Sequence, residues 1–268
     1  MAEIDTSKRI VYRVDGMERI APQRNLVYRR DNGTDLLMDV YAPLDLSPGT
    51  RLPAVMFVHG PIPPEMQPPK DWGIFRSYGE LAAASGLIGV TFNHRLHTPL
   101  QFPQSQANVL AAIEYVRARG TELHVDSERI GFWVFSGGGP HASWVLRERP
   151  AYLRCLLAFY AVLDMRHAVP SNLDAATVSL IHAASPAAYV REHAGDLPMF
   201  VARAGLDVAM INQGIDLFVQ EALAGNASLD LANHSTGHHG FDCLDDNDRS
   251  RAIISNAIAF AKVHLLKK

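Results

Sequence analysis

The 268-residue sequence has few of the features that mark specialised classes of protein. It has only two cysteines, Cys155 and Cys243, which are too few for a disulfide framework, so we expect a reducing compartment, the cytoplasm. Cys155 lies in an apolar run that predicts a buried side chain. Cys243 follows a group of histidines, where a redox or nucleophilic role is the alternative to simple packing. The net charge is −3 and no dense group of Lys and Arg is present, which argues against a nucleic-acid partner.

Long apolar runs, internal repeats and low-complexity segments are also missing. No apolar run reaches the length that spans a bilayer, and residues 1–10 are polar, so we expect neither a signal peptide nor a membrane anchor. Hydrophobic residues make up 48% of the chain and charged residues 20%, which is typical of a folded globular protein. A chain of this length can bury a substantial core.

Strand-like and helix-like segments alternate along most of the chain. Residues 24–42 predict a β-hairpin, with Asp31-Asn32-Gly33 as its turn. The later strands are expected at 52–59, 87–93, 130–135, 155–163, 198–204 and 228–233, and the helices at 74–85, 104–119, 137–149, 212–224 and 249–266. This alternation predicts an α/β fold, with a mostly parallel sheet, helices on both faces and the antiparallel hairpin at one edge.

One segment, residues 165–196, breaks this alternation. It contains Pro170 and Pro186, a modest helical pattern over 175–184 and no convincing strand. We therefore expect a single domain, residues 1–268, in which 165–196 forms a small cap insertion. The cap would lie over the carboxyl ends of the strands, where open α/β sheets place their sites.

The strongest functional signal lies between Arg129 and Pro140. An apolar strand pattern ends at Ser136, and three glycines and the start of a helix follow it. This layout is typical of a nucleophile elbow, a strained turn that exposes a serine hydroxyl. The usual motif is Gly-x-Ser-x-Gly; Gly138 matches it, whereas Val134 stands where the first glycine is expected. A flexible loop or an anion-binding helix N-terminus is the alternative for this glycine-rich segment.

A serine nucleophile needs a base that takes its proton and an acid that orients the base. Asp207 follows a strand, and a histidine-rich segment, 234–242, follows the last strand, so the chain order is Ser, Asp, His. Asp164, at the end of an earlier strand, competes with Asp207 for the acid role, whereas Asp216 falls in a helix and is expected at the surface.

The histidine-rich segment has two further interpretations. It could be a solvated polar turn without a role in catalysis. His234 and His238 also have a spacing found in zinc sites, but no Cys or Glu partner lies nearby in the sequence.

Taken together, the chain resembles the α/β-hydrolase superfamily, specifically its bacterial carboxylesterase and dienelactone-hydrolase-like branches, over residues 24–266. The matching segments, besides the elbow, are Asp39-Val40-Tyr41-Ala42-Pro43, Val58-His59-Gly60, Asn93-His94-Arg95-Leu96, Ser185-Pro186-Ala187-Ala188-Tyr189-Val190, Arg203-Ala204-Gly205-Leu206-Asp207 and His239-Gly240-Phe241. The resemblance implies the α/β-hydrolase fold and a catalytic triad of Ser136, Asp207 and His239. It favours His239 over His238, because the base of the family stands directly before Gly-Phe.

The resemblance also implies an oxyanion hole with the backbone N–H of Gly137 as one donor. The second donor comes from the loop after the His-Gly strand, where Pro61 has no N–H. Gly60 or Ile62 must then donate, and Gly60 is preferred. Five prolines between 61 and 69 stiffen this loop. The candidate pocket residues are Pro61, Ile62, Met66, Trp72 and His238.

These residues predict a serine hydrolase that cleaves carboxylic esters of small to medium acyl chains through an acyl-enzyme intermediate. No metal and no organic cofactor are required. An amidase, formamidase or peptidase on the same triad, a thioester or lactone substrate, and a catalytically silent hydrolase-fold binding protein are the alternatives. A small-molecule ester is the expected partner, with neither nucleic acid nor membrane, and an exposed edge strand would allow two copies of the chain to pair.

Overall fold

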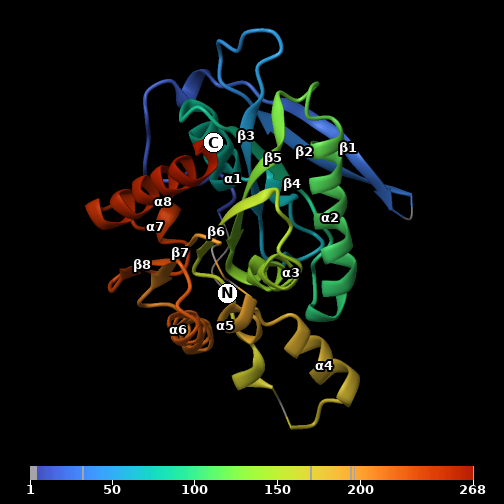
Figure 1. The fold of residues 1–268 in the computed structure, drawn as a ribbon, viewed down its shortest axis with the longest axis vertical. Helices are drawn as coiled ribbons and strands as arrows, with labels where there is room; N and C mark the ends of the chain where they lie inside the picture. Colours follow the sequence, from blue (N-terminus) through green and yellow to red (C-terminus); the bar gives the residue numbers. More distant parts are fainter. Residues whose placement is uncertain (1–4, 32, 170, 194, 196, 268) are drawn as a thin grey trace.

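The computed structural model describes residues 5–31, 33–169, 171–193, 195 and 197–267. Its described strands form one eight-stranded sheet in the order β1-β2-β4-β3-β5-β6-β7-β8 (Figure 1). The strands are β1 (Gln23–Asp31), β2 (Thr34–Tyr41), β3 (Leu52–Val58), β4 (Ile88–Phe92), β5 (Val125–Phe135), β6 (Leu153–Phe159), β7 (Met199–Ala204) and β8 (Leu229–His234). Strands β3 to β8 run parallel, and β1 and β2 form an antiparallel hairpin at one edge. The predicted sheet is confirmed, although Asn32 of the expected turn lies outside the described residues.

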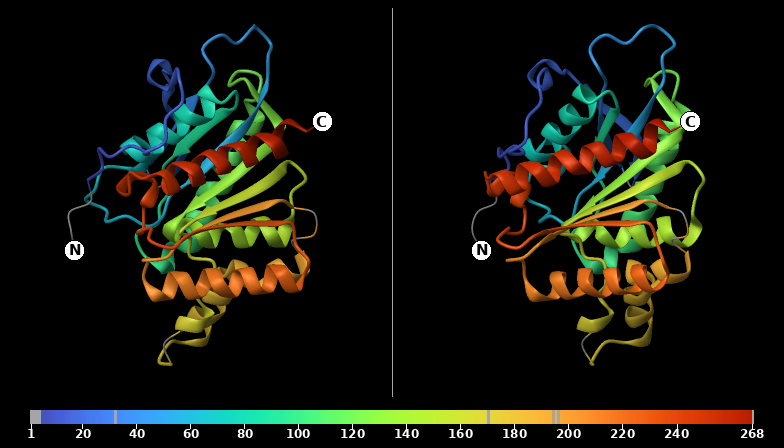
Figure 2. Two further views of the ribbon diagram at one scale, coloured as in Figure 1. Left: turned by 90° about the vertical axis from the view of Figure 1, so that its left-hand side faces the viewer. Right: turned by 60° about the vertical axis from the view of Figure 1, so that its left-hand side comes forward.

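Helices cover both faces of this sheet. They are α1 (Gly73–Ala84), α2 (Phe102–Ala118), α3 (Ala142–Glu148), α4 (Ala175–Ala183), α5 (Val190–His193), α6 (Ala209–Ala224), α7 (Phe241–Leu244) and α8 (Asp248–Leu266). Figure 2 shows α8 and α6 on opposite sides of the strands. Side chains alternate along a strand, so Val55 and Phe57 of β3 pack with α1 and α8, whereas Met56 and Val58 pack with α2, α3 and α6. The central strands are therefore apolar on both faces, as a covered parallel sheet requires.

The turn after β5 differs from the expected continuous helix. A 3-10 helix, Ser136–His141, comes first, and α3 begins only at Ala142. Pro140 lies inside the 3-10 helix and has no N–H to donate, and the glycines before it have little preference for the α-helix. The short α7 was not expected either.

The segment 165–196 connects β6 with β7, and Figure 1 shows its helix α4 at the far lower end of the molecule. Asp174 caps α4 by accepting a hydrogen bond from the Thr177 amide at 2.8 Å. Ser185 ties the segment together, since its hydroxyl donates to the Ile181 carbonyl (2.8 Å) and accepts from the Met165 amide (3.1 Å). In the part of the chain that the structure describes, no helix has the length and apolar character needed to cross a bilayer.

Candidate active site

Ser136 stands where β5 ends, in a backbone conformation that a side chain rarely adopts. Its φ is +53°, in the left-handed region, at a cost of about 1–3 kcal/mol. The Val162 amide donates to the Ser136 carbonyl at 2.9 Å and helps to hold this conformation. The glycines that follow Ser136 are needed because other backbone segments approach them closely. A Cβ on Gly138 would lie 2.6 Å from the carbonyl oxygen of His59, which follows β3, and a Cβ on Gly139 would lie 2.3 Å from the carbonyl oxygen of Val162.

Val134, the departure from the usual elbow motif, is fully buried in the core on the α2 and α3 side of the sheet. Its neighbours in register are Val58 on β3 and Ala158 on β6. The hydrophobic core thus accommodates the valine, and the turn that follows it still carries the left-handed serine.

Three side chains from separate loops form a hydrogen-bonded line. The Nε2 atom of His239, in the loop between β8 and α7, lies 2.9 Å from the Ser136 hydroxyl. Its Nδ1 atom lies 2.7 Å from Oδ2 of Asp207, which follows β7. Because a carboxylate only accepts, Nδ1 carries the proton and Nε2 is left free to accept from the serine. The carboxylate is 2% exposed and also accepts the Val208 amide at 2.7 Å, so it is held in place.

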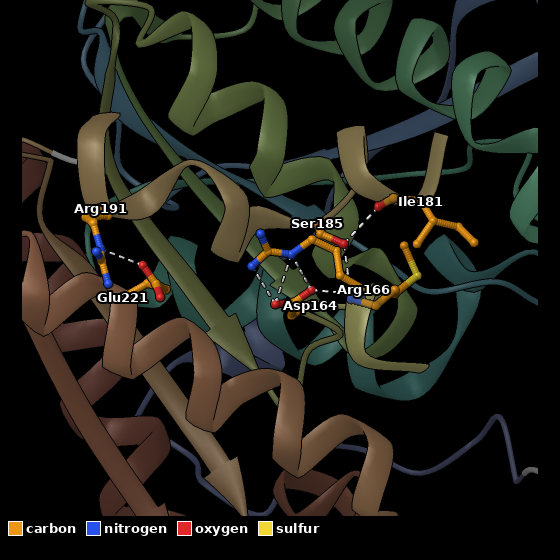
Figure 3. Close-up of polar contacts among 7 residues, drawn as sticks. Asp164, Arg166, Ile181, Ser185, Arg191 and Glu221 are labelled. Atoms are coloured by element: carbon orange, nitrogen blue, oxygen red, sulfur yellow. Dashed lines mark hydrogen bonds and ion pairs between the residues drawn. The ribbon is translucent and has the colours of Figure 1, made fainter. Parts of the chain in front are cut away.

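The competing carboxylates have other partners. The guanidinium of Arg166 binds Asp164 through both oxygens, with a shortest distance of 2.7 Å (Figure 3). Burial raises the pKa of Asp164, but the hydrogen bonds and charge of Arg166 outweigh it, and the net pKa is lowered. Asp216 pairs with Arg203 at 2.8 Å on the surface. Asp207 is therefore the carboxylate that the fold brings to His239.

The neighbouring histidines have separate roles in the structure. His238 is 61% exposed and lies 3.0 Å from Asp245, whose carboxylate also accepts the His238 amide. His234 is buried and hydrogen-bonded to Ser250 at 3.1 Å. Across the described ranges, no three His, Cys, Asp or Glu side chains gather in a way that could hold a metal ion.

Gly60 lies directly against the turn that carries Ser136 and Gly137. A Cβ on Gly60 would lie 2.9 Å from the Gly137 nitrogen and 3.4 Å from the Ser136 Cβ. The Ile62 amide donates to the Leu96 carbonyl at 3.1 Å and is thus occupied, whereas the Gly60 amide has no acceptor among the described residues. Of the two candidates for the second oxyanion donor, the geometry leaves Gly60 free.

A mainly apolar cavity of about 530 Å³ opens beside Ser136. Of the candidate pocket residues, it is lined by Pro61, Ile62 and Trp72, whereas Met66 and His238 do not line it. The sequence did not point to its other walls, which include Phe75, Phe135, Tyr160, Leu244 and, at the N-terminal segment, Asp5 and Lys8. None of the described residues between 165 and 196 lines it.

A buried carboxylate lies behind His239. Asp242 is fully buried and accepts hydrogen bonds from Tyr78 (2.6 Å) and Tyr160 (2.9 Å). The ring of Tyr160 packs 4.7 Å from the His239 ring. Burial raises the pKa of Asp242 to about 6, although the two tyrosine hydroxyls act in the opposite direction. The only sequence signal for this contact was an aspartate placed three residues after the candidate base.

The family model described as BD-FAE matches residues 38–146, from β2 to α3. Est2, described as a novel thermophilic esterase from the Planctomycetes species Thermogutta terrifontis, is similar in its butyrate-bound form, with a TM-score of 0.71, 22% identity and coverage of 94% of this chain and 95% of that chain. Its native form gives a TM-score of 0.74 at 21% identity, with 92% and 93% covered.

Esterase 2 of the same organism, phosphonylated by sarin, gives a TM-score of 0.70 at 20% identity and covers 93% of this chain and 95% of that chain. No curated protein sequence matches the chain. The strand order, the connections and these similarities establish that the chain has the α/β-hydrolase fold, which confirms the fold that the sequence motifs predicted.

Proposed function

We propose that this protein is a serine hydrolase that cleaves carboxylic esters of small to medium acyl chains. The observation that carries the proposal is the line of hydrogen bonds from Ser136 through His239 to Asp207, at the wall of an apolar cavity. The similarity to esterases, one of them phosphonylated by sarin, supports the same chemistry.

The reaction is two-step acyl transfer. Ser136 attacks the ester carbonyl while His239 takes its proton, and Asp207 holds the imidazole and stabilises the imidazolium. The amides of Gly137 and Gly60 bind the negative charge that develops on the carbonyl oxygen. His239 then protonates the leaving alcohol, and a water molecule repeats these steps to release the acid. No metal or organic cofactor takes part.

The cavity supports the choice of substrate. Its volume of about 530 Å³ and its apolar walls suit a short or medium acyl chain better than a large polar group. Similar structures are described as bound to butyrate and to propionate, which are short carboxylates. Amides and formamides would use the same triad, and competition between matched ester and amide substrates separates these activities.

The proposal is tested by labelling with a fluorophosphonate probe, followed by mass spectrometry of the intact protein and its peptides. We expect one adduct, on Ser136, which disappears in Ser136→Ala. Ser179→Ala, a change at an exposed serine of α4, is the matched control and should label like the wild type. A wild type that does not label would favour a silent binding protein and contradict the proposal.

A further inference from the structure

A hydrogen-bonded chain of buried and half-buried polar side chains lies beside the loop that carries Gly60, and the triad chemistry does not use it. It comprises His59 at the end of β3, His94 after β4, Ser105 and Gln106 on α2, and His141 in the 3-10 helix after the elbow. His59, His94, Ser105 and His141 are all at most 4% exposed. The rings of His59 and His94 stack with their centroids 3.8 Å apart.

The chemistry of the partners fixes the direction of the first hydrogen bonds. His94 Nε2 lies 3.1 Å from the carbonyl oxygen of His59. A carbonyl only accepts, so Nε2 carries the hydrogen and Nδ1 of the same neutral ring is an acceptor. The Ser105 hydroxyl, 2.7 Å from that Nδ1, therefore donates to His94.

The hydrogen bonds continue from His94 to the side chains of α2. Because Ser105 donates its only hydrogen to His94, it accepts from Nε2 of His141 at 3.0 Å. His141 Nδ1 is then an acceptor, but the atom that faces it at 3.0 Å is the side-chain oxygen Oε1 of Gln106. Exchanging the amide oxygen and nitrogen of Gln106 places Nε2, a buried atom without a partner, against His141 Nδ1 as the donor. With Gln106 in this orientation, the donors all run in one direction, from Gln106 to the His59 carbonyl.

The hydrogen-bonded chain of side chains ends at the peptide group that contains the candidate oxyanion donor. The His59 carbonyl and the Gly60 N–H belong to one peptide group, and the described part of the chain contains no cis peptide bond. In a trans peptide the C=O and N–H point in opposite directions. Holding the carbonyl on His94 therefore fixes the direction of the Gly60 N–H, on a glycine that lies against Gly137 and Ser136.

We propose that His94 is a positioning residue that aims the Gly60 N–H at the oxyanion, and that Ser105 and His141 keep His94 in the required tautomer. This inference rests on the proposed serine hydrolase function. Burial lowers the pKa of His141 to about 3 and of His59 to about 4, and holds that of His94 well below its usual range. The three rings therefore stay neutral at neutral pH, as the directed hydrogen bonds require.

The negative charge on the carbonyl oxygen exists only in the transition state and the intermediate. A misdirected Gly60 amide should therefore lower kcat and leave KM nearly unchanged. Loss of a whole oxyanion donor costs about 10²–10³-fold in kcat in a well-studied protease, so a misaligned donor should cost about 10- to 100-fold.

The experiment compares His94→Leu, which removes the donor, with His94→Gln, whose amide nitrogen is as many bonds from the backbone as imidazole Nε2. Steady-state hydrolysis of p-nitrophenyl butyrate gives kcat and KM, with enzyme concentration taken from fluorophosphonate titration. His124→Leu is the control, because it removes a 3.1 Å imidazole bond to the Thr50 carbonyl in a loop at the opposite end of the sheet.

We expect kcat to fall about 10- to 100-fold in His94→Leu, to recover to within about threefold in His94→Gln, and to stay at the wild-type value in His124→Leu. Unchanged kcat in His94→Leu, or an equal loss in His94→Gln, would overturn the inference. If His94→Leu does not fold, Ser105→Ala takes its place, and kcat should again fall while KM stays nearly unchanged. A wild type that neither labels nor hydrolyses the ester would refute the proposed function itself, and the inference would fall with it.

Discussion

The buried histidines should make the stability of this protein fall steeply in mild acid. Burial lowers the pKa of His141 from 6.5 to about 3, so the folded state resists a proton that the unfolded chain binds readily. The stabilising effect is complete above pH 6.5 and is lost progressively as the pH falls toward 3. At about 1.4 kcal/mol per pH unit, His141 alone should remove about 2.5 kcal/mol of unfolding free energy between pH 7.5 and 4.5.

Other buried groups also contribute to the pH dependence of the wild type. His59, whose pKa burial lowers to about 4, should remove a further amount of about 2.5 kcal/mol over the same interval. Asp242 acts with the opposite sign, because burial raises its pKa to about 6 and the folded state takes up the proton first. Its protonation should restore about 2 kcal/mol, which is less than the two histidines remove.

The assay is urea unfolding at a series of pH values, for the wild type and for His141→Gln. The glutamine keeps a donor for Ser105 but does not titrate, so the loss between pH 7.5 and 4.5 should be about 2.5 kcal/mol smaller than in the wild type. His182→Gln, at an exposed position of α4, should follow the wild type. An identical pH dependence in wild type and His141→Gln would refute the reasoning.

Further substitutions test the triad acid, the turn after Ser136 and a buried ion pair. Asp207→Ala should lower kcat for ester hydrolysis by at least about 10³-fold. Asp164→Ala, assayed well below its Tm, should change kcat little. The reverse ranking would show that Asp164 is the acid of the triad. Gly138→Ala should lower kcat at least about tenfold, because its Cβ would lie 2.6 Å from a backbone oxygen; wild-type turnover would mean that the elbow tolerates the shift. Lys70→Met should lower the unfolding free energy, measured by urea titration, by about 3–5 kcal/mol. The substitution leaves the fully buried Asp39 without the cation that lies 3.2 Å from it. A loss below about 1 kcal/mol would contradict this expectation.

Much of the fold could be read from local sequence pattern. The buried strands have apolar residues on both faces, and helices with clear apolar periodicity separate them, so order and type of the elements were predictable. The elements that differed from the prediction were those whose conformation depends on one or two residues. The 3-10 helix after Ser136 depends on Pro140 and its glycines, and α7 is only four residues long, too short for a periodic pattern.

The site was predictable only where its residues carry a local signature. Ser136, Asp207 and His239 each follow a strand in the expected order, and the structure brings them within hydrogen-bond distance of one another. The walls of the cavity and the hydrogen-bonded histidines depend on contacts between distant elements. For Tyr160 and His94, for example, no neighbouring residue in the sequence indicates the hydrogen-bond partner, because the partners lie on other strands, helices and loops.

The central claim is tested most directly by hydrolysis of p-nitrophenyl esters from acetate to octanoate, by wild type and by Ser136→Ala. The account predicts turnover by the wild type, with an optimum among the short to medium chains, and loss of at least about 10³-fold in kcat in the variant. Absence of turnover with every ester, or equal turnover by Ser136→Ala, would contradict it.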